Sequence, residues 1–410
     1  MAKPPPSSWA ELPEDILGQV LLRLPSLDDR VRLRAVCRPW RAGAAAQRHP
    51  RLPPPLPWLA LRDGSLVDLH GALVRCAPIV REGVFTYLAV DNLAFLVHDD
   101  GGCSLMNPLS GLTLPLPKLA SVVSRAINKS EVYRQLSRKW AFAKAKLSSP
   151  LDSMLDPLVA VSIIEGQHVA VSSCKQQDAI GIRMCPEGTR GPQRINATDI
   201  AFLHGKLYAL TDHEGLHVIQ LDACHLSEQE SSPGFAFNQC IADNPEQQQV
   251  YFPFDRKGPV CFVMRYLAES NGKLLMIRRW MHYPQTAARL GLHDKTFVFE
   301  VFKADLTTAP GRWTKVDNLD GHAVFLGWQC SKSIVASHCG NGVQENCIYF
   351  MHRVFDNPSN ECFGPCVDPL GDSGVYHMKD EKILLLLPEA VMEELRRKQQ
   401  FLTWFFPAYE

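Results

Sequence analysis

The sequence of 410 residues predicts a small all-α module at the N-terminus, followed by a large all-β domain. The first observation behind this prediction is a set of apolar residues at helical spacing near the N-terminus. The second is the pattern from residue 59 onward, where short strand-like runs alternate with turns that contain Gly, Asp or Asn. We therefore assign a helical module to residues 7–50, a Pro-rich linker to residues 51–58 and the β-domain to residues 59–410.

The helical module begins at Pro13, which suits the first position of a helix because the N–H that proline lacks would have no partner there. The first helix then carries one apolar stripe, made of Ile16, Leu17, Val20, Leu21 and Leu24. Pro25 ends this helix, and Ser26 can cap a second one. A third, short helix is expected to begin near Pro39 and to carry Trp40.

The size of this module is the reason to expect a partner. Stretches near ~40 residues rarely bury enough core by themselves and usually need a staple or a partner. Two helices with apolar stripes and no third layer would leave one face uncovered, and a second protein could supply the missing layer. The alternative is an ordinary helical hairpin that docks onto the rest of the chain. Periodicity favours neither of these two interpretations.

Several fixed spacings in the module agree with a known pattern. Leu12-Pro13 with Ile16-Leu17, then Leu24-Pro25, then Val36-Cys37 with Trp40-Arg41 resemble the F-box in order and spacing. The resemblance implies binding to a Skp-type adaptor and, through it, to a cullin–RING ubiquitin ligase. The residues that we expect to face the adaptor are Leu12, Pro13, Ile16, Leu17, Leu21, Leu24, Pro25, Val36, Cys37 and Trp40.

The β-domain repeats one order of elements: strand, Gly-containing turn, strand and polar loop. One unit spans residues 199–221, and another spans residues 265–277 around Asn271-Gly272, a strong hairpin signal. At roughly 40–50 residues per blade, about seven blades would fit after the linker, so we predict a β-propeller of about six to eight blades. The aromatic segment at residues 404–407 should pack back onto this domain.

These units, together with residues 325–337 and 347–350, resemble a plant F-box family whose C-terminal half is a divergent, kelch-like propeller. The resemblance implies that the propeller binds a client protein. A basic segment near residues 121–150, with seven Lys or Arg between Arg125 and Lys146, does not fit the family pattern. We interpret this segment as an insertion with a solvated face, because charge runs are usually solvating. The alternative is a basic helix that contacts an acidic partner.

Composition narrows the possible partners and compartments. The chain has 43 Lys and Arg against 43 Asp and Glu, which argues against nucleic-acid binding that depends on bulk positive charge. No signal peptide is expected, and no apolar run approaches the ~20 residues of a membrane helix. We therefore expect a protein of the cytoplasm and/or nucleus that does not bind membranes, with its 13 cysteines reduced.

Two groups of residues could suggest a metal site. His213, Glu214 and His217 match the H-E-x-x-H signature of zinc proteases, which requires a helix. Here Asp212 and Gly215 favour a turn between two strands, so the histidines would not converge. A second group has spacings that match a zinc site less well. For this group we favour buried free thiols, and its members are Cys339, Cys347, His352, Cys362 and Cys366. We expect no catalytic residues, no cofactor and no metal.

The sequence therefore predicts the substrate-recognition subunit of a Skp–cullin–F-box type E3 ubiquitin ligase. In this interpretation the F-box binds the Skp-type adaptor and the propeller binds a client protein of unknown identity. Two alternatives remain open at this point. One is a protein-binding propeller that is not part of a ligase, and the other is a zinc-dependent hydrolase acting through His213, Glu214 and His217.

Overall fold

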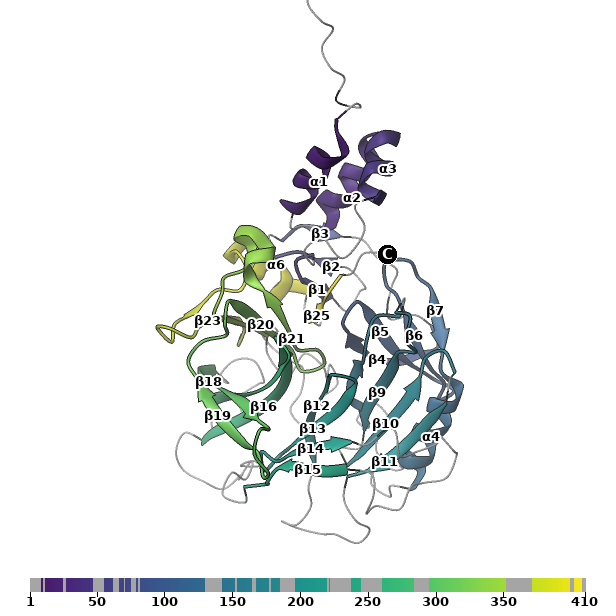
Figure 1. Ribbon diagram of the computed structural model, residues 1–410, viewed down its shortest axis with the longest axis vertical. Coiled ribbons are helices and arrows are strands. Elements are labelled where there is room, and N and C mark those ends of the chain that lie inside the picture. Colours follow the sequence, from purple (N-terminus) through teal and green to yellow (C-terminus); the bar gives the residue numbers. More distant parts are fainter. Residues whose placement is uncertain are drawn as a thin grey trace, which may run out of the picture.

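Three short helices stand at one edge of a ring of β-sheets in the computed structural model (Figure 1). The structure describes residues 9, 12–24, 27–46, 55–61, 66–69, 71–74, 79, 82–129, 142–151, 153–163, 167–176, 178–184, 196–219, 221, 237–244, 260–283, 295–351, 371–398 and 402–407. Within these residues no helix is long and apolar enough to cross a membrane.

The N-terminal helices are α1 (Glu14–Leu22), α2 (Leu27–Val36) and α3 (Arg38–Ala46). Pro13 is extended, with φ −52° and ψ 142°, and comes directly before the first helical residue, one position earlier than expected. Glu14 and Asp15 occupy the first turn of α1, where the helix dipole favours negative charge. Both α1 and α2 pack on α3, so α3 forms a third layer that the sequence analysis did not count.

The described strands form six sheets, which we number as blades 1 to 6 in chain order from β1. Blade 1 has the order β25 (Leu402–Phe405), β1 (Trp58–Leu61), β2 (Leu66–Val67) and β3 (Leu73–Val74). Blade 2 has the order β4 (Val84–Val90), β5 (Leu93–His98), β6 (Cys103–Met106) and β7 (Thr113–Pro115). Blade 3 has the order β8 (Phe142–Leu147), β9 (Leu158–Ile163), β10 (His168–Ser173) and β11 (Ala179–Arg183).

The remaining three blades follow in the second half of the chain. Blade 4 consists of β12 (Ala197–Leu203), β13 (Lys206–Thr211), β14 (Leu216–Ile219) and β15 (Phe237–Ile241). Blade 5 consists of β16 (Val260–Ser270), β17 (Lys273–Tyr283), β18 (Lys295–Asp305) and β19 (Arg312–Val316). Blade 6 has the order β21 (Lys332–Val335), β20 (His322–Leu326), β22 (Cys347–Phe350), β23 (Gly374–His377) and β24 (Ile383–Leu384).

One end strand of each sheet contacts its counterpart in the next sheet, in the order β25, β4, β8, β12, β16 and β21. These inner strands surround the centre of the ring, as Figure 1 shows. The architecture is therefore a six-bladed β-propeller, which confirms the predicted fold class. The blades take up more sequence than the assumed repeat for two reasons. Strands such as β16, β17 and β18 each have 11 residues. Helical segments are also added between or after strands, namely α4 (Pro117–Lys129), η5 (Ala336–Gly342) and α6 (Glu389–Lys398).

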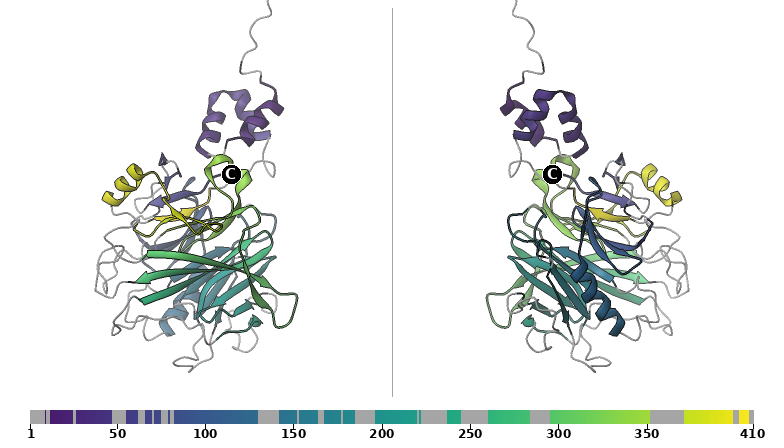
Figure 2. Two further views of the ribbon diagram at one scale, coloured as in Figure 1. Left: turned by 90° about the vertical axis from the view of Figure 1, so that its left-hand side faces the viewer. Right: turned by 90° about the vertical axis from the view of Figure 1, so that its right-hand side faces the viewer.

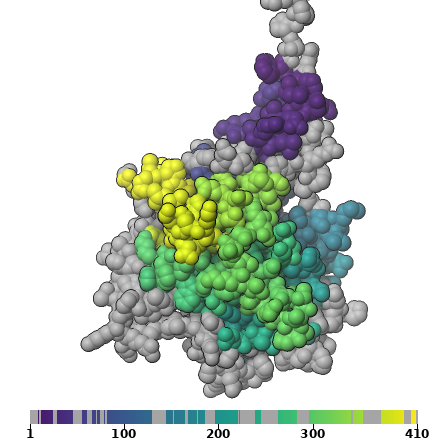
Figure 3. Space-filling view, turned by 60° about the vertical axis from the view of Figure 1, so that its left-hand side comes forward, coloured from purple at the N-terminus to yellow at the C-terminus, as the bar shows by residue number. Residues whose placement is uncertain are grey.

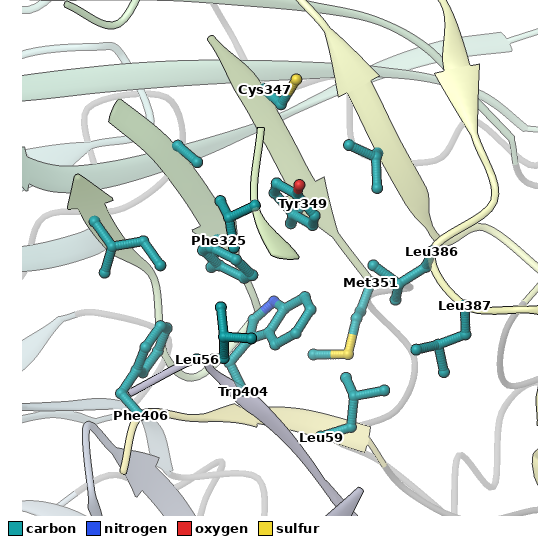
Figure 4. Close-up of a cluster of buried hydrophobic side chains, with 14 of the residues drawn as sticks. Leu56, Leu59, Phe325, Cys347, Tyr349, Met351, Leu386, Leu387, Trp404 and Phe406 are labelled. Atoms are coloured by element: carbon teal, nitrogen blue, oxygen red, sulfur yellow. The ribbon is translucent and has the colours of Figure 1, made fainter. Parts of the chain in front are cut away.

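The ring closes through its two ends, because β25 near the C-terminus pairs antiparallel with β1, and Leu59 lies opposite Trp404. Trp404 is fully buried, donates a hydrogen bond from its indole N–H to the Leu326 carbonyl at 2.9 Å, and meets the Phe325 ring edge-on at 4.9 Å. Figure 4 shows these side chains together with Leu56 and Phe406 in one apolar cluster. The expectation that the aromatic end packs onto the β-domain is confirmed.

The predicted basic insertion divides into three parts. Its start lies in α4, its middle at residues 130–141 is outside the described residues, and its end forms β8, the inner strand of blade 3. The prediction of a solvated face is wrong for β8, because the Lys144 side chain is only 3% exposed. Lys144 lies 2.6 Å from the Asp199 carboxylate and 5.2 Å from the centre of the Tyr266 ring, which compensate the ammonium for its lost hydration.

Candidate protein-interaction surfaces

The helical module has an apolar core of its own. Leu17 and Leu21 of α1 are 2% and 1% exposed and pack with Leu33 of α2 and Ala44 of α3. Gly43 lets α3 come close to α1, because a Cβ at this position would lie 2.9 Å from the nearest methyl carbon of Leu17. The three helices therefore bury one side of the apolar stripe of α1 within the module.

This core changes the role of two predicted adaptor contacts. Leu17 and Leu21 do not reach the surface, so we correct their expected role from adaptor contact to support of the module. The other predicted residues within the described chain are at least partly accessible, namely Pro13, Ile16 and Val36, which are exposed, and Leu12, Leu24, Cys37 and Trp40, which are half-buried. Pro25 lies outside the described residues.

An apolar surface remains on the outside of the module. Ile16 and Val20 lie one turn apart on α1 and are 45% and 37% exposed, while Val31 and Val36 on α2 are 52% and 61% exposed. We use the name exposed apolar face for these four accessible residues taken together, two on α1 and two on α2. The sequence analysis included Val20 in the apolar stripe but not among the adaptor contacts, and it did not name Val31. The signal that could have identified Val20 is its i, i+4 relation to Ile16.

The module meets the propeller through α2. Arg30 is fully buried, and its Nε donates to the Leu24 carbonyl. Burial lowers the pKa of the Arg30 guanidinium to about 10, and the Cys339 thiol of η5 lies close enough to oppose that shift. Burial likewise raises the pKa of Cys339 to about 11. Arg30 therefore lies where α2 approaches η5, in agreement with the position of the helices in both views of Figure 2.

The exposed apolar face is not covered by the described part of the propeller. The helices project from the β-domain in the space-filling view (Figure 3). Ile16 would be sealed if the module were a hairpin docked by its stripe onto the propeller, but nearly half of this side chain is accessible. The structure therefore does not favour the alternative in which the apolar stripe serves only to dock the module onto its own chain.

The H-E-x-x-H segment is a turn, as the sequence predicted. β13 ends at Thr211, β14 begins at Leu216, and Glu214 between them has a left-handed φ of 63°. The Glu214 carboxylate accepts hydrogen bonds from Arg265 at 2.7 Å and from Arg278 at 2.5 Å. Two guanidinium groups therefore hold this carboxylate.

His217 of this segment lies beside a carboxylate of a neighbouring strand end. The Nε2 atom of His217 lies 3.3 Å from the Asp243 carboxylate. Burial alone would raise the pKa of Asp243, but hydrogen bonds from His217 and Thr211 bring it below its usual value. Among the described residues no group of three or more His, Cys, Asp or Glu side chains could hold a metal ion.

The loose cysteine group is only partly described. Cys339 and Cys347 are buried, and burial raises the pKa of the Cys347 thiol to about 11. The Cys347 sulfur lies 3.5 Å from Nδ1 of His377, a residue that the sequence analysis did not consider. His352, Cys362 and Cys366 lie outside the described residues.

Comparison with known families agrees with this division of the chain. An F-box-like family model matches residues 9–46, which contain α1, α2 and α3. A second model, described as the KIB1-4 beta-propeller, matches residues 63–377, which is most of the chain. The chain belongs to the KIB1-4 beta-propeller family.

These two families are typically non-catalytic, and together they describe an F-box protein of the substrate-receptor type. The KIB1-4 match ends before β25 and begins after β1, so it leaves out the two strands that close the ring. The chain is also 23% identical over 366 residues to the "Putative F-box protein At5g55150" of Arabidopsis thaliana, a match that covers 88% of this chain and 89% of the relative.

Two solved structures show weaker likeness to this KIB1-4 propeller. YCF48 from Cyanidioschyzon merolae has a TM-score of 0.30 and 11% identity, with 63% of this chain and 69% of that chain covered. The computationally designed Ika8 protein has a TM-score of 0.29 and 12% identity, with 74% of each chain covered. We draw no conclusion from likeness at these TM-scores.

Proposed function

We propose that this KIB1-4 family chain is the substrate-recognition subunit of a Skp–cullin–F-box type E3 ubiquitin ligase. The F-box module would bind the Skp-type adaptor, and the propeller would hold a client protein. The observation that carries this proposal is the exposed apolar face, formed by Ile16, Val20, Val31 and Val36, on a module whose core is already complete. An apolar face that the described part of its own chain leaves uncovered favours a protein partner.

The proposed mechanism needs no chemistry from this chain. The receptor would hold a client lysine close to a ubiquitin-loaded conjugating enzyme, and so raise the effective concentration of the two reactants. This mechanism requires a rigid connection between the adaptor and the client. The burial of Arg30 of α2, close enough to Cys339 of η5 for the thiol to influence its pKa, supports such a connection. A chain with this role would work in the cytoplasm and/or nucleus.

The exposed apolar face offers a cleaner test than the core of the module. Substitution of Leu17 or Leu21 would disturb folding and binding together, since both are buried. We therefore combine Ile16→Asp with Val20→Asp, which places two carboxylates on the accessible face of α1. A fully buried side chain of this size contributes about 1.5–3 kcal/mol, so adaptor affinity should fall about 100-fold or more.

Affinity is measured with the full chain and a purified plant Skp-type adaptor by isothermal titration calorimetry. The matched control is Leu155→Asp, because Leu155 is 76% exposed on the propeller and lies between β8 and β9. This control should bind the adaptor like the unmodified chain, and all three proteins should have similar melting temperatures. Equal adaptor affinity for the double variant and the control would contradict the proposal.

A further inference from the structure

A cleft opens between blades 5 and 6 of the propeller. Its volume is about 650 Å³, and its lining comes from β17, β18, β19, β23 and the residues that follow β19 and β23. One wall is aromatic and includes Trp280, Phe299 and Tyr376. At the mouth, Phe297 is 38% exposed and stacks on His282 with ring centres 4.2 Å apart.

The aromatic wall is held in place from behind. Phe299 contacts the rings of both Tyr376 and Phe350, each with ring centres 5.1 Å apart and tilted by nearly 60°. The Tyr376 hydroxyl also lies 3.5 Å from the Phe299 carbonyl. Phe299, Tyr376 and Phe350 are all buried, so this packing fixes the wall from behind. The rings that an incoming group can reach are those of Trp280, which is half-buried, and Phe297, which is exposed.

The charged residues that line the cleft differ in whether they already have a partner. Glu300 is already paired, because its carboxylate accepts from Lys315 at 2.8 Å, Trp280 at 2.9 Å and Arg278 at 3.3 Å. Asp317 and Glu381 also line the cleft, and the structure gives no ion pair for either of them within the described residues. Lys315, the positively charged residue of the cleft lining, already pairs with Glu300. The carboxylates of Asp317 and Glu381 therefore remain for an incoming group.

The two remaining carboxylates differ in their contacts. Asp317 accepts from the side-chain amide of the next residue, Asn318, at 3.0 Å. Glu381 has a left-handed φ of 56° in the turn between β23 and β24, and it is exposed. Burial raises the pKa of the neighbouring Tyr376, and the Glu381 carboxylate adds to this shift, which places its negative charge beside the aromatic wall.

We propose that this cleft holds an arginine side chain from an extended segment of the client protein; the proposal rests on the client-binding role given above. The planar guanidinium stacks on aromatic faces and donates a fork of hydrogen bonds to carboxylates. The cleft offers both partners, with the ring wall on one side and Asp317 and Glu381 at the edge. An anionic or neutral side chain would leave these carboxylates without a counter-charge.

The surface beside the cleft indicates what flanks the arginine. Ile383, Leu384 and Leu385 follow Glu381 closely and are 37%, 51% and 57% exposed. Within the described chain, β24 is the end strand of its sheet, so its outer edge and these side chains suit an extended segment with apolar residues. The occupant is therefore a client segment with one arginine between apolar residues.

The test uses the full chain and two fluorescein-labelled peptides, measured by fluorescence anisotropy. The first peptide is acetyl-Gly-Leu-Arg-Leu-Gly, and the second replaces arginine by citrulline, which keeps the shape and removes the charge. We expect the arginine peptide to bind at least about tenfold more tightly than the citrulline peptide, and the preference to weaken as salt increases. Equal binding of the two peptides, or no binding of either, would overturn the proposal.

Variants then locate the binding site. Asp317→Asn with Glu381→Gln should abolish the preference for arginine, while Glu82→Gln, an exposed residue before β4, should preserve it. Unchanged preference in the double variant would place the site elsewhere and overturn the assignment to this cleft. The double variant should still bind the Skp-type adaptor with full affinity. If the unmodified chain binds the adaptor but does not discriminate between the two peptides, only the assignment to the cleft is contradicted. If the adaptor does not bind the unmodified chain, the proposed ligase role is contradicted.

Discussion

At the scale of the residue, the inner strands of the ring are joined by a buried ion pair. Lys144 of β8 pairs with Asp199 of β12 at 2.6 Å, and both side chains are almost completely buried. Asp199 also accepts backbone N–H groups from Ile200 and from Leu267 of β16, each at 2.8 Å. One carboxylate thus connects blades 3, 4 and 5, and the Lys144 ammonium is buried only because this partner is present.

Removing Asp199 should therefore be the more damaging change. Asp199→Ala leaves a buried ammonium without its carboxylate, so the free energy of unfolding should fall by about 3–5 kcal/mol. Lys144→Met should cost less, because the remaining carboxylate keeps its two backbone donors. Urea unfolding followed by fluorescence measures both changes.

A surface ion pair provides the comparison for these variants. Lys118 and Asp178 lie 2.6 Å apart but are 51% and 32% exposed, so Lys118→Met should change the free energy of unfolding by less than about 1 kcal/mol. If Asp199→Ala were no more destabilising than Lys118→Met, the buried pair would not have the structural role that we assign to it.

At the scale of the element, local signals identified hairpins well. The turn at Asn271 and Gly272, with φ of 50° and 69°, joins β16 to β17 as the Asn-Gly signal predicted. Likewise, the helical spacing around Ile16 located α1. These features depend on neighbours within a few residues, so the sequence carries them directly.

Elements defined by distant contacts were not predictable in the same way. Periodicity placed Leu17 and Leu21 in a stripe but could not show that α3 covers one side of it, since that depends on how three helices pack. The inner position of β8 depends on Asp199, which is far along the chain from Lys144. In blade 6, β20 pairs in parallel with β22 and β21 takes the inner place, an order that no local turn signal reveals.

Ring closure gives a prediction for a single element. A chain that ends at residue 398 lacks β25, and so loses the Trp404 indole and the pairing with β1. We expect this chain to lose its cooperative thermal transition, because blade 1 would then lack its inner strand and expose the cluster around Phe325 and Leu59.

The control for this truncation is a chain that ends at Pro407, which keeps all of β25. Its melting temperature by differential scanning calorimetry should be close to that of the full chain. A cooperative transition at the same temperature in the chain that ends at residue 398 would show that β25 is not needed to close the propeller.

At the scale of the whole molecule, the two modules have complementary properties. The helical module completes its own core, approaches the propeller near Arg30 and leaves an apolar face accessible (Figures 2 and 3). The propeller closes on itself and offers a cleft with aromatic and acidic lining between blades 5 and 6. One chain therefore carries two separate surfaces suited to proteins, which is the arrangement that a substrate receptor requires.

Hydrogen–deuterium exchange of the full chain, with and without a plant Skp-type adaptor, tests the central claim most directly. We expect the adaptor to slow amide exchange in α1 and α2, around Ile16, Val20 and Val31, while the strands of blades 3 to 5 keep their exchange rates. Protection confined to the propeller, or no protection anywhere at saturating adaptor, would contradict the proposal that the exposed apolar face is the adaptor-binding surface.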